Sequence, residues 1–253
     1  MIPLRDDQPC KSFAFVNYSI IAVNLAVFGY EMSVRARGYP AWRDMLMRYG
    51  TVPHHFELAF TGSSQYTISG AFLSILTAMF MHASILHIIG NMWVLWIFGD
   101  NIEDHLGHIE YLLFYLLCGF LASMVHIYAN PNLDIPAVGA SGAIAGVMGA
   151  FLLRYPLARV QMLVIFSLLA ANVVWMPAWG MLGFWFFFQF IGVILAQVLQ
   201  PHVPHTTGGG VAYWAHVGGF LVGMVLIKII PGHAQYAHGG WLAKDGKEIL
   251  PKQ

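Results

Sequence analysis

The sequence predicts an all-α polytopic membrane protein with six transmembrane helices, and its composition carries that prediction. Hydrophobic residues make up 58% of the 253 residues and charged residues only 9%, whereas about a quarter of an ordinary soluble domain is charged. No Lys, Arg, Asp or Glu occurs between Arg159 and Lys228. The formal net charge of zero provides no basic surface for nucleic acid. The lipid bilayer is therefore the first expected partner.

Six apolar segments approach the roughly 20 residues that a spanning helix needs. In chain order they are Asn17–Tyr30, Ile85–Asn101, Tyr111–Tyr128, Ser141–Tyr155, Gly180–Leu199 and Ala212–Ile230. The long stretch Met32–Gly70 mixes arginines with Trp and Tyr, which is typical of an interfacial loop. Val160–Val174 is apolar but short for a span, and the sequence alone assigns it no element.

An even number of spans places both termini on one side of the membrane. Eight of the twelve Lys and Arg residues then fall on that side, so the positive-inside rule makes it cytoplasmic. We therefore expect a plasma (inner) membrane protein with three parts. Residues 1–16 form a cytoplasmic N-terminal segment, residues 17–231 the six-helix membrane domain, and residues 232–253 a flexible polar tail.

The chain is organised around the stretch Ile135–Ala150, which reads IPAVGASGAIAGVMGA. One hydroxyl, Ser141, lies where a loop enters an apolar helix. At helical spacing this helix carries two neighbouring rows of small residues, which are Ser141, Ala145 and Gly149 in one row and Gly142, Gly146 and Ala150 in the other. The last span carries a matching row of Ala215, Gly219 and Gly223. Small residues let helix backbones approach closely inside lipid, so we expect the fourth and sixth spans to pack together.

Polar side chains within spans are expensive and indicate function by default. Ser141 and His216 begin two spans that run parallel, so they reach the same membrane face. A serine needs a base within hydrogen-bond reach, and a neutral histidine can accept its proton. His87 and Asn91 are four residues apart on one helix face, and they can add donors to an oxyanion hole at the start of the fourth span. Asp134, in the preceding loop, is a candidate for a third member of the site.

Three motifs in these positions resemble the rhomboid intramembrane serine proteases. They are HxxxN at His87–Asn91, GxSG at Gly139–Gly142, and AHxxGxxxG at Ala215–Gly223, and Glu103 matches the acidic position of the turn after the second span. The resemblance implies a rhomboid-like bundle with a long interfacial first loop and a catalytic dyad of Ser141 and His216. It also implies an oxyanion hole formed by His87, Asn91 and the Ser141 N–H. The glycines Gly139, Gly142, Gly146, Gly219 and Gly223 would pack the helices around it.

The sequence departs from the family pattern at two places around this site. Ala145 stands where an aromatic residue often follows the serine by four positions and stacks on the histidine. Leu73 and Ser74 stand where many members have Trp-Arg before the second span. None of these departures removes a catalytic group.

The expected function is a serine endopeptidase that cleaves transmembrane segments of membrane protein substrates, with no metal and no cofactor. One alternative is a catalytically silent rhomboid-like protein that binds transmembrane helices. Another is a transporter, because the chain has 12 histidines, although these are scattered along it. A zinc intramembrane protease lacks support because no HExxH motif occurs. The sequence leaves the oligomeric state open.

Overall fold

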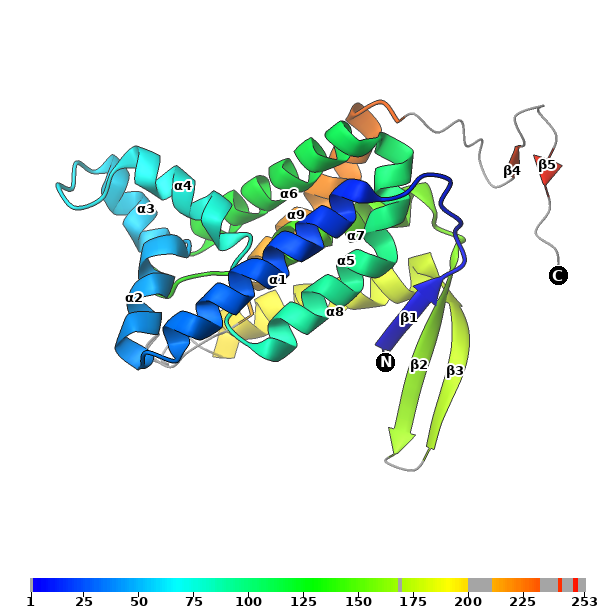
Figure 1. Ribbon diagram of the computed structural model, residues 1–253, viewed down its shortest axis with the longest axis horizontal. Helices are drawn as coiled ribbons and strands as arrows, with labels where there is room; N and C mark the ends of the chain where they lie inside the picture. Colours follow the sequence, from blue (N-terminus) through cyan, green and yellow to red (C-terminus); the bar gives the residue numbers. More distant parts are fainter. Residues whose placement is uncertain (1, 168–169, 200–210, 233–240, 243–247, 250–253) are drawn as a thin grey trace.

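The computed structural model describes residues 2–167, 170–199, 211–232, 241–242 and 248–249. Helices dominate, and Figure 1 shows them packed into one bundle with a small sheet at its side. The helices are α1 (Phe15–Arg35), α2 (Tyr39–Tyr49), α3 (Pro53–Phe60), α4 (Ile68–Ala78), α5 (Ile85–Leu106), α6 (His108–Ala129), α7 (Ser141–Arg154), α8 (Ala178–Leu199) and α9 (Tyr213–Ile229). The strands are β1 (Ile2–Asp6), β2 (Arg159–Ser167), β3 (Ala170–Pro177), β4 (Trp241–Leu242) and β5 (Glu248–Ile249).

Each of the six expected spans coincides with a helix, but the helices differ in length. Among the described residues, α1, α5, α6 and α8 are long and apolar enough to cross a membrane. The other two, α7 and α9, have only 14 and 17 residues. α7 is buried along most of its length, whereas α9 packs one face against the other helices and leaves Leu221, Val225 and Ile229 exposed. The count of six spans therefore stays a prediction.

The all-α description is wrong for the apolar segment between α7 and α8. Val160–Val174 forms most of an antiparallel hairpin of β2 and β3, and β1 pairs with β2 as the third strand. Figure 1 shows the hairpin extending away from the helices. β-branched and aromatic residues are frequent here, and such residues favour strands. The N-terminal segment, expected only as a cytoplasmic stretch, thus contributes an edge strand. Apart from Gly232, β4 and β5, the expected polar tail (residues 232–253) lies outside the described residues.

The first loop, expected at Met32–Gly70, contains the short helices α2 and α3, and α4 follows it. These three helices gather at one end of the bundle in Figure 1. The isolated bridge between Thr51 and Ala137 ties this region to the loop that precedes α7. Gly139 N–H also donates to Ala78 O at 2.9 Å. The first loop therefore braces the chain immediately before Ser141.

Glu103 joins three helices at the opposite end of the bundle. Its fully buried carboxylate accepts hydrogen bonds from the N–H groups of Val16 (2.9 Å) and Asn17 (2.6 Å), at the start of α1. It also lies 2.5 Å from His108 Nδ1, at the start of α6. α1 has no side-chain cap of its own, so this carboxylate satisfies N–H groups that would otherwise lack partners and complements the helix dipole.

The closest helix contact is between α7 and α9. A Cβ atom added to Gly219 would overlap the carbonyl oxygen of Gly142, and one added to Gly223 would overlap that of Gly146. On α7, a Cβ atom at Gly149 would overlap the carbonyl oxygen of Phe220. α7 and α9 thus pack against each other through glycines.

We expect Gly223→Ala to lower the free energy of unfolding by about 1–3 kcal/mol, because the methyl group forces two helix backbones apart. The matched control is Gly183→Ala on α8, where an added Cβ meets nothing within 4 Å. Thermal unfolding of both variants in detergent measures the difference. Equal unfolding midpoints would contradict the close contact.

A second prediction concerns pH and β1. Burial raises the pKa of Asp6 from 3.8 to about 7, and nearby Asp100 and Asp7 add to this effect. The folded state therefore holds a proton that the unfolded state has lost. Stability from this group is complete below about pH 4 and is lost as the pH rises through about 7. We expect amide exchange in β1, corrected for intrinsic rates, to be better protected at about pH 5 than at about pH 8. Asp6→Asn should remove this pH dependence, and an unchanged pH dependence in that variant would assign it to another group.

Candidate active site

Ser141 is the first residue of α7, and the backbone before it explains its position. Gly139 has a φ of +135°, which L side chains rarely adopt. A Cβ atom there would lie only 2.8 Å from Cε1 and Nε2 of His87. Glycine at this position thus permits both the turn into α7 and the close approach of His87. The Ser141 side chain then stands at the positive end of the α7 dipole.

His216 lies in the first turn of α9 and contacts Ser141 directly. Its Nε2 atom is 2.8 Å from Ser141 Oγ, a normal hydrogen-bond distance. The close α7–α9 packing brings together these two residues, which are 75 positions apart in the chain. The predicted meeting of Ser141 and His216 is therefore present in the structure.

The other ring nitrogen of His216 has a partner that the sequence reasoning missed. His216 Nδ1 lies 2.8 Å from Oε1 of Gln189, near the middle of α8. The Trp185 ring is also near His216, with 5.8 Å between the ring centroids. The sequence signal for Gln189 was a polar residue within an apolar span. It was missed because the aromatic residues before it, Trp185–Phe188, are typical of a lipid-facing packing surface.

Asp134, the candidate third member, lies elsewhere. Its Oδ1 atom is 2.7 Å from Nδ1 of His54 in the first loop. Both side chains are substantially exposed, and the pair ties the loop before α7 to α3. Asp134 therefore has a partner of its own and does not contact His216.

His87 and Asn91 lie beside Gly139. An added Cβ at Gly139 would be 3.7 Å from Asn91 Nδ2, so the predicted pair does face the backbone that precedes Ser141. Asn91 Nδ2 donates to Nε2 of the fully buried His82 at 2.9 Å. The amide group of Asn91 has a second N–H, which remains available for another acceptor.

A buried carboxylate fixes the segment that carries His82. Glu31, on α1, is 1% exposed, and its two carboxylate oxygens accept the backbone N–H of His82 at 3.2 and 3.0 Å. The His82 ring packs edge-on against His87, with 5.1 Å between centroids. The order of contacts thus runs from Glu31 through His82 to Asn91.

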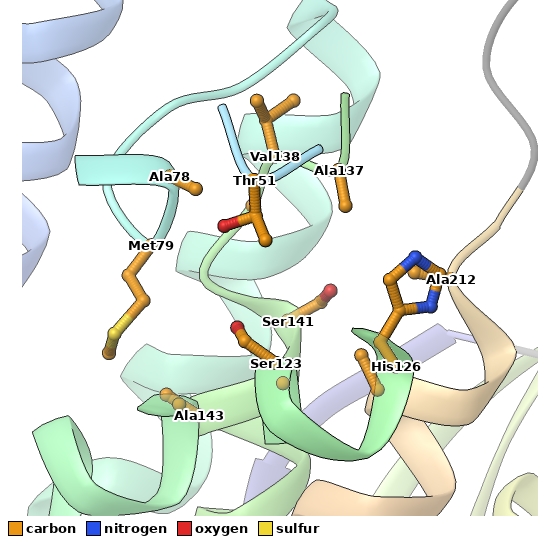
Figure 2. A pocket seen from close by; sticks show the side chains of 14 residues that line it. Thr51, Ala78, Met79, Ser123, His126, Ala137, Val138, Ser141, Ala143 and Ala212 are labelled. Carbon is orange, nitrogen blue, oxygen red and sulfur yellow. The ribbon is translucent and has the colours of Figure 1, made fainter. Parts of the chain in front are cut away.

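A small pocket opens beside Ser141. Figure 2 shows Ser141, Ser123 and His126 directed into it, with Thr51, Ala137 and Val138 on another side. The space open to the centre of a water molecule is about 30 Å³, enough for roughly two waters. Nε2 of His126 is buried without a hydrogen-bond partner among the described residues, so the pocket wall has a polar atom that can bind water.

The site contains no evident metal centre within the described part of the chain. No group of three or more His, Cys, Asp or Glu side chains is placed there to hold an ion. The arrangement instead joins a hydroxyl, an imidazole and several N–H donors around a space for water. These are the groups that acyl transfer to serine requires.

We expect His82→Leu to lower the free energy of unfolding by about 1–3 kcal/mol, because it leaves the buried Asn91 amide without an acceptor. His54→Leu is the control, since it removes an exposed histidine whose ion pair should contribute little. Detergent-based unfolding measures both. A similar loss of unfolding free energy in the two variants would mean that the hydrogen bond from Asn91 to His82 does not stabilise the fold.

Comparison with known proteins places this arrangement in a family. The chain is 32% identical over 168 residues to RHOMBOID-like protein 6, mitochondrial, of Arabidopsis thaliana, covering 66% of this chain and 45% of that protein. It is 32% identical over 122 residues to the mouse presenilin-associated rhomboid-like protein, mitochondrial, covering 45% and 32%. YdcA of Bacillus subtilis, named as a candidate rhomboid protease, is 28% identical over 127 residues, covering 50% and 56%.

The chain thus spans less than two thirds of each of these relatives. A family model for the Rhomboid domain matches residues 69–232, which include every residue of the site except those on α1 and the first loop. On that match, the chain belongs to the rhomboid family.

Proposed function

We propose that the chain is an intramembrane serine endopeptidase that cleaves transmembrane segments of membrane proteins. The observation that carries the proposal is the 2.8 Å contact between Ser141 Oγ and His216 Nε2. Membership of the rhomboid family supports it, as does the position of Ser141 at a helix N-terminus. A helix binder without catalysis has no need of a paired nucleophile and base.

In the first step, Ser141 Oγ attacks the carbonyl carbon of the scissile peptide while its proton passes to His216 Nε2. The negative charge moves to the carbonyl oxygen, which the Ser141 N–H, the Asn91 amide and the His87 ring can stabilise. The C–N bond then breaks, and the leaving amine takes the proton from His216. Ser141 remains as an acyl ester.

The second step hydrolyses that ester. His216 Nε2 accepts a proton from water, the hydroxide attacks the acyl carbon, and the Ser141–acyl bond breaks with return of the proton to Oγ. The small pocket beside Ser141 has room for this water. Ser123 and His126, which line it, provide polar atoms that can retain water in an otherwise apolar bundle.

We place both termini on the same face of the membrane, which follows from six crossings by α1, α5, α6, α7, α8 and α9. The plasma membrane was expected from charge distribution alone. Two of the relatives named above are described as mitochondrial, so the comparisons lend the plasma membrane no support. The proposal is therefore an integral membrane location, with transmembrane proteins as substrates.

We expect a fluorophosphonate probe to label the purified wild-type protein in mild detergent, because an activated serine reacts with it. Ser141→Ala and His216→Ala should remove labelling, the first by deleting the nucleophile and the second by deleting its base. Asp134→Asn is the control and should label like the wild type, since Asp134 pairs with His54 rather than His216.

Each outcome has a defined meaning when all four proteins unfold at similar temperatures. Labelling that persists in Ser141→Ala would locate the nucleophile elsewhere. A folded wild-type protein that never reacts would contradict the protease and favour the helix-binding alternative. Loss of labelling in Asp134→Asn would reinstate that residue as part of the site.

A further inference from the structure

We infer that Gln189 is a positioning residue for His216, fixing the ring tautomer that lets Nε2 accept the proton of Ser141. The inference rests on the proposed function and adds a third member to its dyad. Gln189 Oε1 is a carbonyl oxygen and can only accept a hydrogen bond. At 2.8 Å from Nδ1, it requires the proton to be on Nδ1, which leaves the lone pair on Nε2.

The alternative tautomer would disable the pair. With the proton on Nε2, the imidazole would donate toward Ser141 Oγ and could not serve as its base. A free imidazole exchanges between the two forms, so an acceptor at Nδ1 selects the productive one. Catalytic triads use a carboxylate for this purpose. Here a neutral amide does the same without placing an additional charge in an apolar span, where a charge is costly.

Trp185 supports the same conclusion from a second direction. Trp185 and Gln189 are four residues apart, so they lie one turn apart on the same face of α8. Both contact His216, the first through its ring and the second through Oε1. Ala145, on α7, is fully buried and has no ring to offer. The face of α8 therefore orients the imidazole, in place of an aromatic residue on α7.

Among the described residues, the other polar groups near His216 do not offer this contact. Asp134 pairs with His54, and Asn130 approaches Nδ1 of His126 rather than of His216. His87 and Asn91 lie against Gly139. Gln189 is thus the residue whose oxygen is within hydrogen-bond distance of His216 Nδ1.

The test compares Gln189→Met, which keeps the length of the side chain but removes the acceptor, with Gln189→Glu, which keeps an acceptor. Gln197→Met, an exposed position further along α8, is the matched control. The first readout is the rate of fluorophosphonate labelling. We expect a roughly tenfold loss in Gln189→Met, about the effect of one hydrogen bond. Gln189→Glu should recover much of the rate, and Gln197→Met should label like the wild type.

The second readout is the ¹⁵N spectrum of protein labelled at histidine, with His216 assigned by comparison with His216→Ala. Wild-type His216 should show a protonated Nδ1 and an unprotonated Nε2, and Gln189→Met should lose that preference. A purely structural role for Gln189 would leave the tautomer unchanged. Protonated Nε2 in the wild type, or equal labelling rates and tautomers in wild type and Gln189→Met, would overturn the inference.

The two proposals fail in different ways. If the wild type labels and Gln189→Met matches it in rate and tautomer, the protease stands and the positioning role falls. If no variant labels but the tautomer still depends on Gln189, the positioning role stands and the protease falls. Should Gln189→Met not fold, the wild-type tautomer and Gln189→Glu still decide the matter.

Discussion

The close approach of α7 and α9 is the constraint on which the rest of the site depends. At Gly149, Gly219 and Gly223 the backbone of the partner helix leaves no space for a Cβ atom. In lipid, dispersion between closely packed backbones replaces the hydrophobic effect as the source of helix association. Because both helices begin at the same end of the bundle, this contact also fixes the distance between Ser141 and His216. The helix packing and the geometry of the candidate site therefore share one cause.

Hydrogen bonds between buried side chains set the geometry of the remaining groups. Glu31 fixes the backbone of His82, and His82 accepts from Asn91. A buried polar group without a partner is costly in an apolar surrounding. These contacts consequently favour one arrangement of the donors around Ser141. The residues before α5 also hold the chain before Ser141, through the Thr51–Ala137 bridge and the hydrogen bond from Gly139 N–H to Ala78 O.

The sequence predicted the helices and the meeting of Ser141 with His216 because both depend on local pattern. The spacing of the glycines at 142, 146, 219 and 223 indicated which two helices pack together. Because the fourth and sixth expected spans run parallel, Ser141 and His216 were expected at the same end of the bundle. The hairpin was beyond such reasoning, since the periodicity of a short apolar run such as Val160–Val174 does not distinguish a strand from a buried helix. The partner of His216 Nδ1 could not be predicted from the sequence either. Asp134 was the acidic candidate close to Ser141 in the sequence, whereas Gln189 meets His216 only because α8 packs beside α9.

The residues of the candidate site lie on helices that differ in how much of their surface is buried in the bundle. Ser141 and His216 belong to α7 and α9, whose backbones touch. Gln189 belongs to α8. Only 11% of the apolar 18-residue stretch of α8 is buried inside the protein, against 50% of that of α5. Segments with few buried contacts open more readily than those in the core. A displacement of α8 would therefore leave Ser141 beside His216 but remove the acceptor from Nδ1. On this argument the distance within the dyad is a fixed property of the bundle, and the tautomer of its base follows the position of α8.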